Sequence, residues 1–130
     1  MKERQLISSG AKWESIVGYS RAVRVGKFVY VAGTTATDAQ GEIVGIDDPY
    51  TQTKHIFTKI QTALQEAGAS LEHVVRTRMF VVNVADWEQI GKAHGEFFRE
   101  IRPASMLVEV SGLIDPKMLV EIEVEAIIHE

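Results

Sequence analysis

Residues 120–127 read Val-Glu-Ile-Glu-Val-Glu-Ala-Ile, and this stretch indicates the fold most directly. Apolar residues alternate with glutamates along it. Because successive side chains of a strand point to opposite faces of a sheet, the pattern predicts a β-strand with one apolar and one acidic face. The period alone does not decide which face meets a layer of helices. The better candidate is the apolar set, Val120, Ile122, Val124 and Ala126.

Residues 73–84, HVVRTRMFVVNV, predict a second strand rich in valine and aromatic residues. Strict alternation divides it into two sets: Val75, Thr77, Met79 and Val81 on one face, and Val74, Arg76, Arg78, Phe80 and Val82 on the other. If the helices cover the more uniformly apolar faces of these strands, the opposite face of the sheet mixes arginines, glutamates and apolar side chains. A monomer would expose Phe80 and Val82 there, so the pattern favours a homo-oligomer that covers this face.

Two helices are expected between the strands. Asp47 or Asp48 can cap the first, Pro49 suits its first turn, and Gly68 ends it. The second helix follows Asp86 and ends before the proline at position 103.

The remaining segments supply the other strands. Two strands within 19–34 are joined by a hairpin at Gly26-Lys27, a short strand lies within 4–10, and strands at 104–113 and 118–128 end the chain. The polar segment 8–20 is expected only to connect strands, with Trp13 packed against the end of the sheet rather than lining a pocket beside Tyr19. The order β-β-β-α-β-α-β-β predicts one α+β domain over residues 1–130, with two helices on one face of the sheet.

Composition excludes several classes of protein. The chain has 130 residues, of which 45% are hydrophobic and 25% are charged, which fits one globular domain. A net charge of −4 and a pI of about 5.6 provide no basic field, so binding to nucleic acid is not expected. Cysteine is absent, which excludes disulfides and zinc-thiolate sites. No signal-peptide pattern or long apolar run appears, so a cytoplasmic protein without membrane association is expected.

No cofactor or metal site is indicated either. The glycines form neither a phosphate-binding loop nor a dinucleotide fingerprint. The four histidines fall on different elements and lack metal-ligand spacing. We therefore expect chemistry, if any, without a metal or a cofactor.

The segment 101–110, IRPASMLVEV, places Arg102 between a helix and a strand. Arg102 can hold a carboxylate through two hydrogen bonds, or it can be a cation that closes a helix, and the residues leave both interpretations open. Arg76 and Arg78 can hold anions or can pair with the glutamates across the sheet. A glutamate of residues 121–125 can orient a water molecule, and Tyr19 can offer a hydroxyl group or only an aromatic edge.

Four segments, taken in order, resemble the RidA/YjgF/YER057c family, also called the endoribonuclease L-PSP family: GYSRAVRVGKFVYVAGT, ALQEAGASLEHVVRTRMFVVNVADW, AHGEFFREIRPASMLVEV and VEIEVEAI. The resemblance implies a chorismate-mutase-like α+β fold with a mixed sheet. It also implies a homotrimer whose sheets form a central barrel, with three ligand sites in clefts between subunits. Active members of the family hydrolyse reactive enamines and imines, such as 2-aminoacrylate, to 2-oxo acids and ammonia without a cofactor.

The resemblance also assigns individual residues. Tyr19 falls on the family's pocket tyrosine, Gly33 on its strand-end glycine, and Glu123 on the glutamate that helps to place the attacking water. The family run P-A-R-[ST] is here Pro-Ala-Ser-Met, so Ser105 stands where an arginine binds the substrate carboxylate. A serine offers one neutral hydrogen bond, and loss of the charged pair costs about 2–4 kcal/mol if that pair is desolvated.

Two arginines are candidates to replace this anchor. Arg78 is the better one if Glu123 shares its face of the sheet, whereas Arg102 lies three residues before Ser105, about 10 Å along a strand. The resulting hypothesis is a RidA-like homotrimer whose intersubunit clefts bind a small anionic metabolite and hydrolyse a reactive imine or enamine. The alternative is a ligand-binding or regulatory trimer without catalysis.

Overall fold

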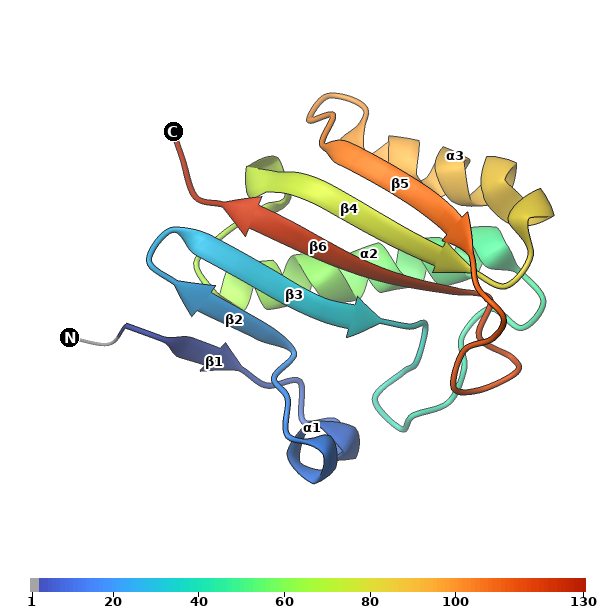
Figure 1. The fold of residues 1–130 in the computed structure, drawn as a ribbon, viewed down its shortest axis with the longest axis horizontal. Coiled ribbons are helices and arrows are strands. Elements are labelled where there is room, and N and C mark those ends of the chain that lie inside the picture. The colour runs from blue at the N-terminus through green and yellow to red at the C-terminus, as the bar shows by residue number, and fades with distance from the viewer. Residues whose placement is uncertain (1–2) are drawn as a thin grey trace.

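The computed structural model describes residues 3–130 and contains a six-stranded sheet in the order β1-β2-β3-β6-β4-β5 (Figure 1). The strands are β1 Gln5–Ile7, β2 Ala22–Val25, β3 Phe28–Thr34, β4 Val74–Val81, β5 Ala104–Glu109 and β6 Val120–Ile127. Neighbouring strands are antiparallel except β4 and β5, which are parallel, so the sheet is mixed. The predicted hairpin at Gly26-Lys27 is confirmed, because β2 ends at Val25 and β3 begins at Phe28.

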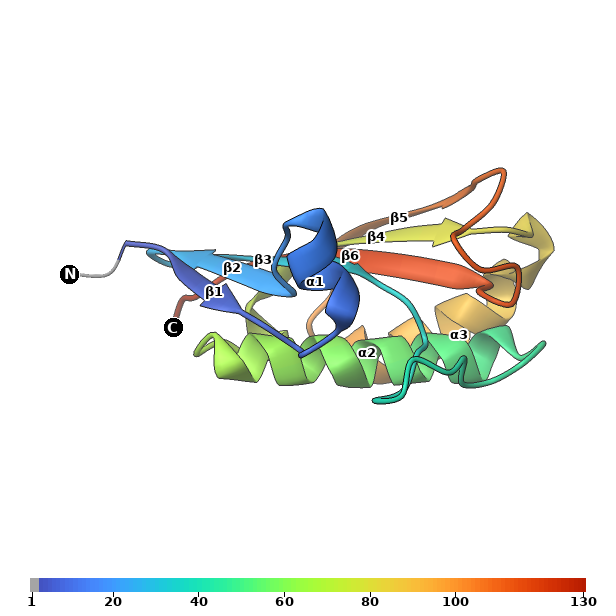
Figure 2. The same ribbon diagram turned by 90° about the horizontal axis from the view of Figure 1, so that it is seen from below.

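Three helices accompany the sheet: α1 Lys12–Val17, α2 Pro49–Glu66 and α3 Trp87–Phe98. Figure 2 shows α2 and α3 together on one face, as the sequence predicts. The mixed α+β arrangement is therefore confirmed. No helix within residues 3–130 is both long and apolar enough to cross a membrane.

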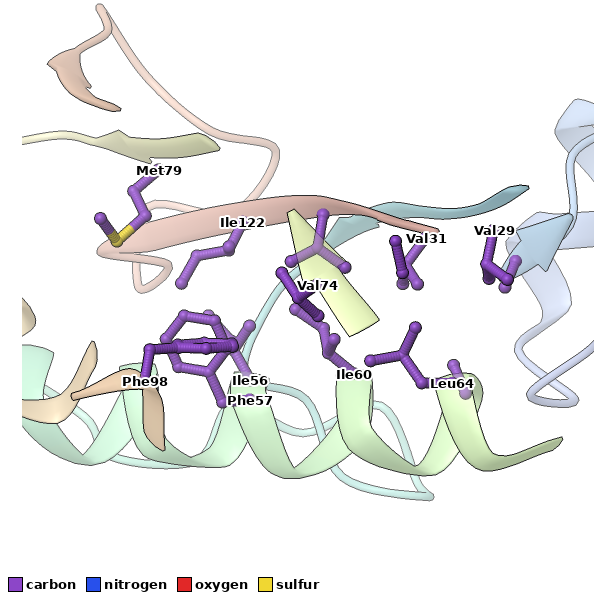
Figure 3. Packing of buried hydrophobic residues seen from close by; sticks show 14 of the residues in the cluster. Val29, Val31, Ile56, Phe57, Ile60, Leu64, Val74, Met79, Phe98 and Ile122 are labelled. Carbon is purple, nitrogen blue, oxygen red and sulfur yellow. The ribbon is translucent and has the colours of Figure 1, made fainter. Parts of the chain in front are cut away.

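Strand β6 lies in the middle of the sheet, between β3 and β4. Its predicted division of faces is confirmed: Val120, Ile122, Val124 and Ala126 are buried toward the helices, and the glutamates between them are only half-buried. On α2, Ile56, Phe57, Ile60 and Leu64 point into the same layer, where they meet Val31, Ile122 and Phe98 (Figure 3). One apolar layer thus holds the sheet and both helices together.

The predicted division of β4 is correct from Arg76 onward and wrong at its start. Val74 is buried among the helix-facing residues, whereas Val75 is exposed. The pairing with β6 shifts between Val74 and Arg76: two steps on β4 correspond to one step on β6. A bulge at Val75 therefore interrupts the alternation, because the extra residue exchanges the faces on either side of it. The strand also ends at Val81, before the predicted residue 84.

The ends of α2 follow the predicted signals. The Asp48 side chain accepts hydrogen bonds from Thr51 N at 3.0 Å and Thr51 Oγ1 at 2.7 Å, and Pro49 occupies the first turn. Gly68 follows the helix with a φ of 86°, a left-handed conformation that favours glycine. Asp86 precedes α3 as expected, but its side chain makes no capping hydrogen bond to that helix.

Helix α1 was not predicted, since residues 8–20 were expected only to connect strands. Its Glu14 is buried and accepts hydrogen bonds from the hydroxyl groups of Ser8 and Ser9, which ties the helix to the preceding loop. Gly18 closes it with a φ of 93°. The expectation that Trp13 packs against the sheet is also wrong: its side chain is 54% exposed beside the Lys12 ammonium group.

Neither α2 nor α3 lies on the second face of the sheet (Figure 2). Several large apolar residues are exposed on the chain near this face and the sheet edges, including Val25, Phe28, Tyr30 and Val108. The uncovered face is the feature that favours association of several copies.

Candidate functional site

Three of the predicted site residues, Tyr19, Glu123 and Arg102, line two hollows of the chain, whereas Gly33, Arg78 and Ser105 line neither. The first has a volume of about 590 Å³ and is lined by Tyr19 and Glu123, together with residues of β1–β3 and Glu14 of α1. The second has a volume of about 520 Å³ and lies where α3 ends and β5 begins, lined by His94, Gly95, Phe98, Arg99, Arg102 and Pro103.

A buried arginine supports the first hollow. Arg21 is only 9% exposed and donates from Nη1 to Gly33 O and to Thr34 Oγ1, both at 2.9 Å. Its Nη2 donates to the Tyr19 hydroxyl oxygen at 3.3 Å. Because the guanidinium occupies that oxygen as an acceptor, the hydroxyl proton of Tyr19 remains free to turn toward a ligand.

Arg21 was not among the predicted site residues. Its Nε lies 3.6 Å from Glu14 Oε2, an ion pair too long to be a hydrogen bond. A signal was present in the sequence: Arg21 comes two residues after Tyr19, at strand spacing, and directly before the buried Ala22.

Gly33 provides space for a carboxylate. A Cβ at this position would lie 2.5 Å from Glu121 Oε2, so the absence of a side chain lets Glu121 lie over β3. Burial raises the pKa of Glu121, the positive charge of Arg21 opposes the rise, and the negative charge of Glu123 adds to it. A carboxyl group with a raised pKa thus lies over the end of β3, two residues before Glu123 of the first hollow.

Arg78 is held by two carboxylates. Its Nη1 lies 3.1 Å from Glu123 Oε1 and 2.6 Å from Glu125 Oε2. The Glu125 hydrogen bond is the largest cause of a raised pKa for Arg78. Glu123 and Arg78 share one face of the sheet, which was the condition for Arg78 to replace the missing carboxylate-binding arginine. The two ion pairs, however, correspond to the other interpretation, in which Arg78 pairs with glutamates within the sheet. The second carboxylate oxygen of Glu123 remains available to the hollow.

Arg102 closes a helix, and its role as a carboxylate ligand stays a prediction. Its backbone has a φ of 60°, and its N–H donates to Phe98 O at 2.8 Å, so it closes α3 in a left-handed conformation. Its side chain nevertheless lines the second hollow together with Arg99. Within residues 3–130 neither arginine forms an ion pair, so both guanidinium groups are available to an anion.

Ser105 lies beside this second hollow, on the exposed edge of β5. Its Oγ is 2.7 Å from Thr77 Oγ1, and Thr77 Oγ1 is 2.9 Å from His94 Nε2. Burial lowers the pKa of His94. No role was predicted for Thr77, because its contact with His94 depends on how α3 crosses β4.

No group of three or more side chains suited to hold a metal ion occurs among residues 3–130. The polar groups that the two hollows present are a hydroxyl group, carboxylates, guanidinium groups and an imidazole. These groups can bind a small anion, orient a water molecule and exchange protons.

The sequence profile of the family described as Endoribonuclease L-PSP matches residues 9–128. The chain belongs to this family. The match covers all six predicted site residues and every residue that lines the second hollow, so the resemblance found in the sequence is confirmed.

Relatives of this L-PSP family chain support the assignment. It is 43% identical over 121 residues to an uncharacterized protein of Streptomyces coelicolor, covering 92% of this chain and 89% of that protein. It is 36% identical over 104 residues to 3-aminoacrylate deaminase RutC of Acinetobacter baylyi, covering 80% and 82%. The crystal structure of Rv2704 from Mycobacterium tuberculosis, a YjgF/YER057c/UK114 family member, matches with a TM-score of 0.88 and 46% identity over 96% of this chain and 99% of that one.

Within one copy of the L-PSP family chain, the predicted site is divided. Tyr19, Gly33 and Glu123 lie together around β3 and β6, on the face opposite α2 and α3. Arg102 and Ser105 lie at the β5 edge, beside α3. Strands β2 and β5 are separated by three strands of the sheet, so one chain does not bring the two groups into a single site.

Proposed function

We propose that the protein is a cofactor-independent hydrolase of small reactive imines or enamines that carry a carboxylate. The observation that carries this proposal is the 36% identity, over 80% of the chain, to a protein named 3-aminoacrylate deaminase. The reaction adds water to the C=N bond of the imine and releases a carbonyl compound and ammonia. An imine is already electrophilic, so placement of substrate and water accounts for most of the catalysis required.

The proposed sites are clefts between copies in a homotrimer whose uncovered sheet faces form a central barrel. Two features of the chain support this arrangement. The hollow with Tyr19 and Glu123 and the hollow with Arg102 belong to different faces of the same sheet. Exposed aromatic residues such as Phe28 and Tyr30 need a partner surface. A neighbouring copy supplies the missing half of each site and covers these residues at once.

The roles of the residues follow from their contacts. Arg99 and Arg102 bind the substrate carboxylate in place of the arginine that Ser105 replaces. From the neighbouring copy, the Tyr19 hydroxyl donates to the polarised substrate, and Glu123 orients the attacking water. Arg78 holds the Glu123 side chain in place through their ion pair, which suits a group that accepts a hydrogen bond from water.

The test uses 3-aminoacrylate and 2-aminoacrylate, generated enzymatically in the cuvette, with release of ammonia as the readout. Micromolar protein should accelerate the release from at least one substrate, and no acceleration with either refutes the hydrolase. Glu123→Gln should lower kcat, whereas Glu125→Gln is the matched control. Both glutamates pair with Arg78, but only Glu123 lines the first hollow.

Mixed trimers test the shared cleft. Glu123→Gln damages one hollow, and the double variant Arg99→Ala/Arg102→Ala damages the other. If each cleft combines the two hollows from different copies, trimers reassembled from an equal mixture contain about a quarter of intact clefts and regain activity accordingly. Two inactive variants that remain inactive after mixing would show that each site belongs to one copy.

The replaced arginine favours one alternative: a trimer that binds a small carboxylate without turnover. Ser105 carries no charge at the position where the family resemblance places the anchor. Calorimetric titration with a 2-oxo acid such as 2-oxobutanoate separates the two functions. Binding that is lost in Arg99→Ala/Arg102→Ala, together with no ammonia release by the unaltered protein, would establish the binding function instead.

A further inference from the structure

Three side chains from three elements form a hydrogen-bonded chain between the surface and the helix layer. Ser105 of β5 is exposed, Thr77 of β4 is fully buried, and His94 of α3 lies beneath them. The distances are 2.7 Å between Ser105 Oγ and Thr77 Oγ1, and 2.9 Å between Thr77 Oγ1 and His94 Nε2. The register of the parallel strands places Thr77 and Ser105 directly side by side.

The surroundings of His94 favour a neutral ring. Phe57 of α2 meets the imidazole edge-on at 5.5 Å between centroids, and Phe98 lies against it at 4.8 Å. The charged groups that share its hollow are both cations, Arg99 and Arg102. Burial lowers the pKa of His94 from its ordinary value of 6.5, so the ring is neutral at pH 7. A neutral imidazole can accept a proton.

The chain of hydrogen bonds can run in either direction. Neutral histidine carries its proton on one ring nitrogen and accepts on the other, and each hydroxyl group has a single proton. If Nε2 is protonated, it donates to Thr77, Thr77 donates to Ser105, and Ser105 donates outward. If Nδ1 is protonated, Nε2 accepts from Thr77 and Thr77 accepts from Ser105, so Ser105 can accept from outside. Thr77 is shielded from solvent, so its hydroxyl joins the two ends without competition from bulk water.

We propose that Ser105, Thr77 and His94 form a proton relay between a substrate at the β5 edge and the half-buried imidazole. This inference rests on the imine-hydrolase function proposed above and deepens it. Arg99, Arg102 and Pro103 line the second hollow, and Ser105 follows Pro103 by two residues on β5, so in this proposal a carboxylate held by the arginines directs its C=N carbon toward Ser105. The ligand class is therefore a small imine with a carboxylate close to the C=N group.

The relay balances the protons of the hydrolysis. As water attacks the C=N carbon, its proton passes to Ser105 Oγ, the Ser105 proton passes to Thr77 Oγ1, and the Thr77 proton passes to His94 Nε2. The imidazolium then returns one proton along the same path to the nitrogen of the addition product. The relay then works a second time: the hydroxyl proton of the addition product passes through it to the nitrogen. The C–N bond breaks as this oxygen becomes the carbonyl, ammonia leaves, and all three side chains regain their initial protonation. Ser105 touches the reacting atoms, whereas Thr77 and His94 act through it.

The first readout needs neither substrate nor activity. Nitrogen NMR of the labelled trimer reports which ring nitrogen of His94 carries the proton. Without the Ser105 hydroxyl, Thr77 donates only to His94, so Ser105→Ala should shift the ring toward the Nδ1-protonated tautomer. Thr77→Val should remove the Nε2 hydrogen bond, and Thr77→Ser should restore it. Identical His94 nitrogen shifts in the unaltered protein, Ser105→Ala and Thr77→Val would overturn the relay.

The second readout is the rate of ammonia release. Thr77→Val and His94→Phe, which keeps an aromatic ring, should each lower kcat by about a hundredfold, in line with loss of general acid–base assistance. Because the relay works as one unit, the double variant should be no slower than either single variant. Thr58→Val on the exposed face of α2 is the matched control. If the unaltered protein shows no hydrolysis, the proposed function fails, while the NMR readout still decides whether the relay exists. Additive losses in the double variant, or unchanged kcat in folded Thr77→Val, would overturn its catalytic role.

Discussion

Replacement of Arg21 by glutamine should destabilise the chain strongly. The guanidinium is 9% exposed and donates to Gly33 O, Thr34 Oγ1 and the Tyr19 hydroxyl. It also provides the positive charge beside Glu14. Glutamine is shorter and uncharged, so it reaches fewer of these acceptors and leaves Glu14 as a buried carboxylate without its cation.

The size of the effect follows from the buried pair. Removal of one partner of a buried ion pair typically costs about 3–5 kcal/mol. The hydroxyl groups of Ser8 and Ser9 still hydrogen-bond Glu14, so we expect Arg21→Gln to lower the free energy of unfolding by about 3 kcal/mol. That is a large share of the about 5–15 kcal/mol of an ordinary domain.

Urea denaturation at pH 7, followed by circular dichroism, measures this loss. Arg76→Gln is the matched control, because Arg76 is exposed on the same sheet and should change the free energy by less than about 0.5 kcal/mol. Glu14→Gln/Arg21→Gln should recover part of the loss, since it removes both charges. An Arg21→Gln variant as stable as the control would refute the structural role of the guanidinium.

The pH dependence gives an independent check of the same pair. Burial acts to raise the pKa of Glu14, but the hydrogen bonds of Ser9 and Ser8 and the charge of Arg21 outweigh it, so the pKa lies below the ordinary 4.5. The stabilisation from this carboxylate is therefore present above pH 4.5 and is lost as the pH falls through the folded-state value. Arg21→Gln should weaken this loss of stability in acid.

Three further outcomes are expected. Phe57→Ala removes a fully buried ring that contacts Phe98, so it should lower the free energy of unfolding by about 3–5 kcal/mol. Urea denaturation measures this loss, and a loss below about 1 kcal/mol would contradict the burial of Phe57 against Phe98. Burial lowers the pKa of Lys59 to about 8, so between pH 8 and 10.5 this group binds more protons in the unfolded chain than in the folded one. The free energy of unfolding should therefore rise with pH in this range, and Lys59→Met should flatten the rise. An NMR titration that places the pKa of Lys59 near 10.5 would contradict the lowered pKa. Tyr30→Glu places a charge on the uncovered sheet face and should shift the proposed trimer toward monomer in light scattering, whereas an unchanged mass would contradict the proposed interface.

The layers of the fold were predictable because their signals are local. The alternation of residues 120–127 identified the buried face of β6, and the Asp48-Pro49 start and Gly68 end of α2 follow from chemistry within a few residues. The bulge at Val75 was not predicted, because strict alternation assigns successive residues to opposite faces and does not allow for an inserted residue. Helix α1 escaped because Glu14 binds the serines of the preceding loop, and six residues are too few for a clear apolar stripe.

The candidate site was predictable only in part. The side chains of Tyr19 and Glu123 do line one hollow, as their assigned roles require. Arg21 was missed because its importance comes from contacts with the end of β3, twelve or more residues away. The Ser105–Thr77–His94 chain depends on the parallel register of β4 and β5, for which the sequence between them provides no local signal.

In the proposed function, the charges around the two hollows account for anion recognition by a chain that lacks an arginine at position 105. Arg78 is neutralised by Glu123 and Glu125, and Arg21 is engaged by backbone, hydroxyl and carboxylate groups, so neither has a free charge to offer a ligand. Arg99 and Arg102 have no such partner within residues 3–130. The proposal therefore moves anion recognition from the strand to the end of α3, where Ser105 carries a proton instead of a charge. A substrate fits this arrangement only if its carboxylate and its C=N carbon span the distance between the end of α3 and the edge of β5. The serine at position 105, in place of arginine, is therefore expected to change which imine the protein prefers.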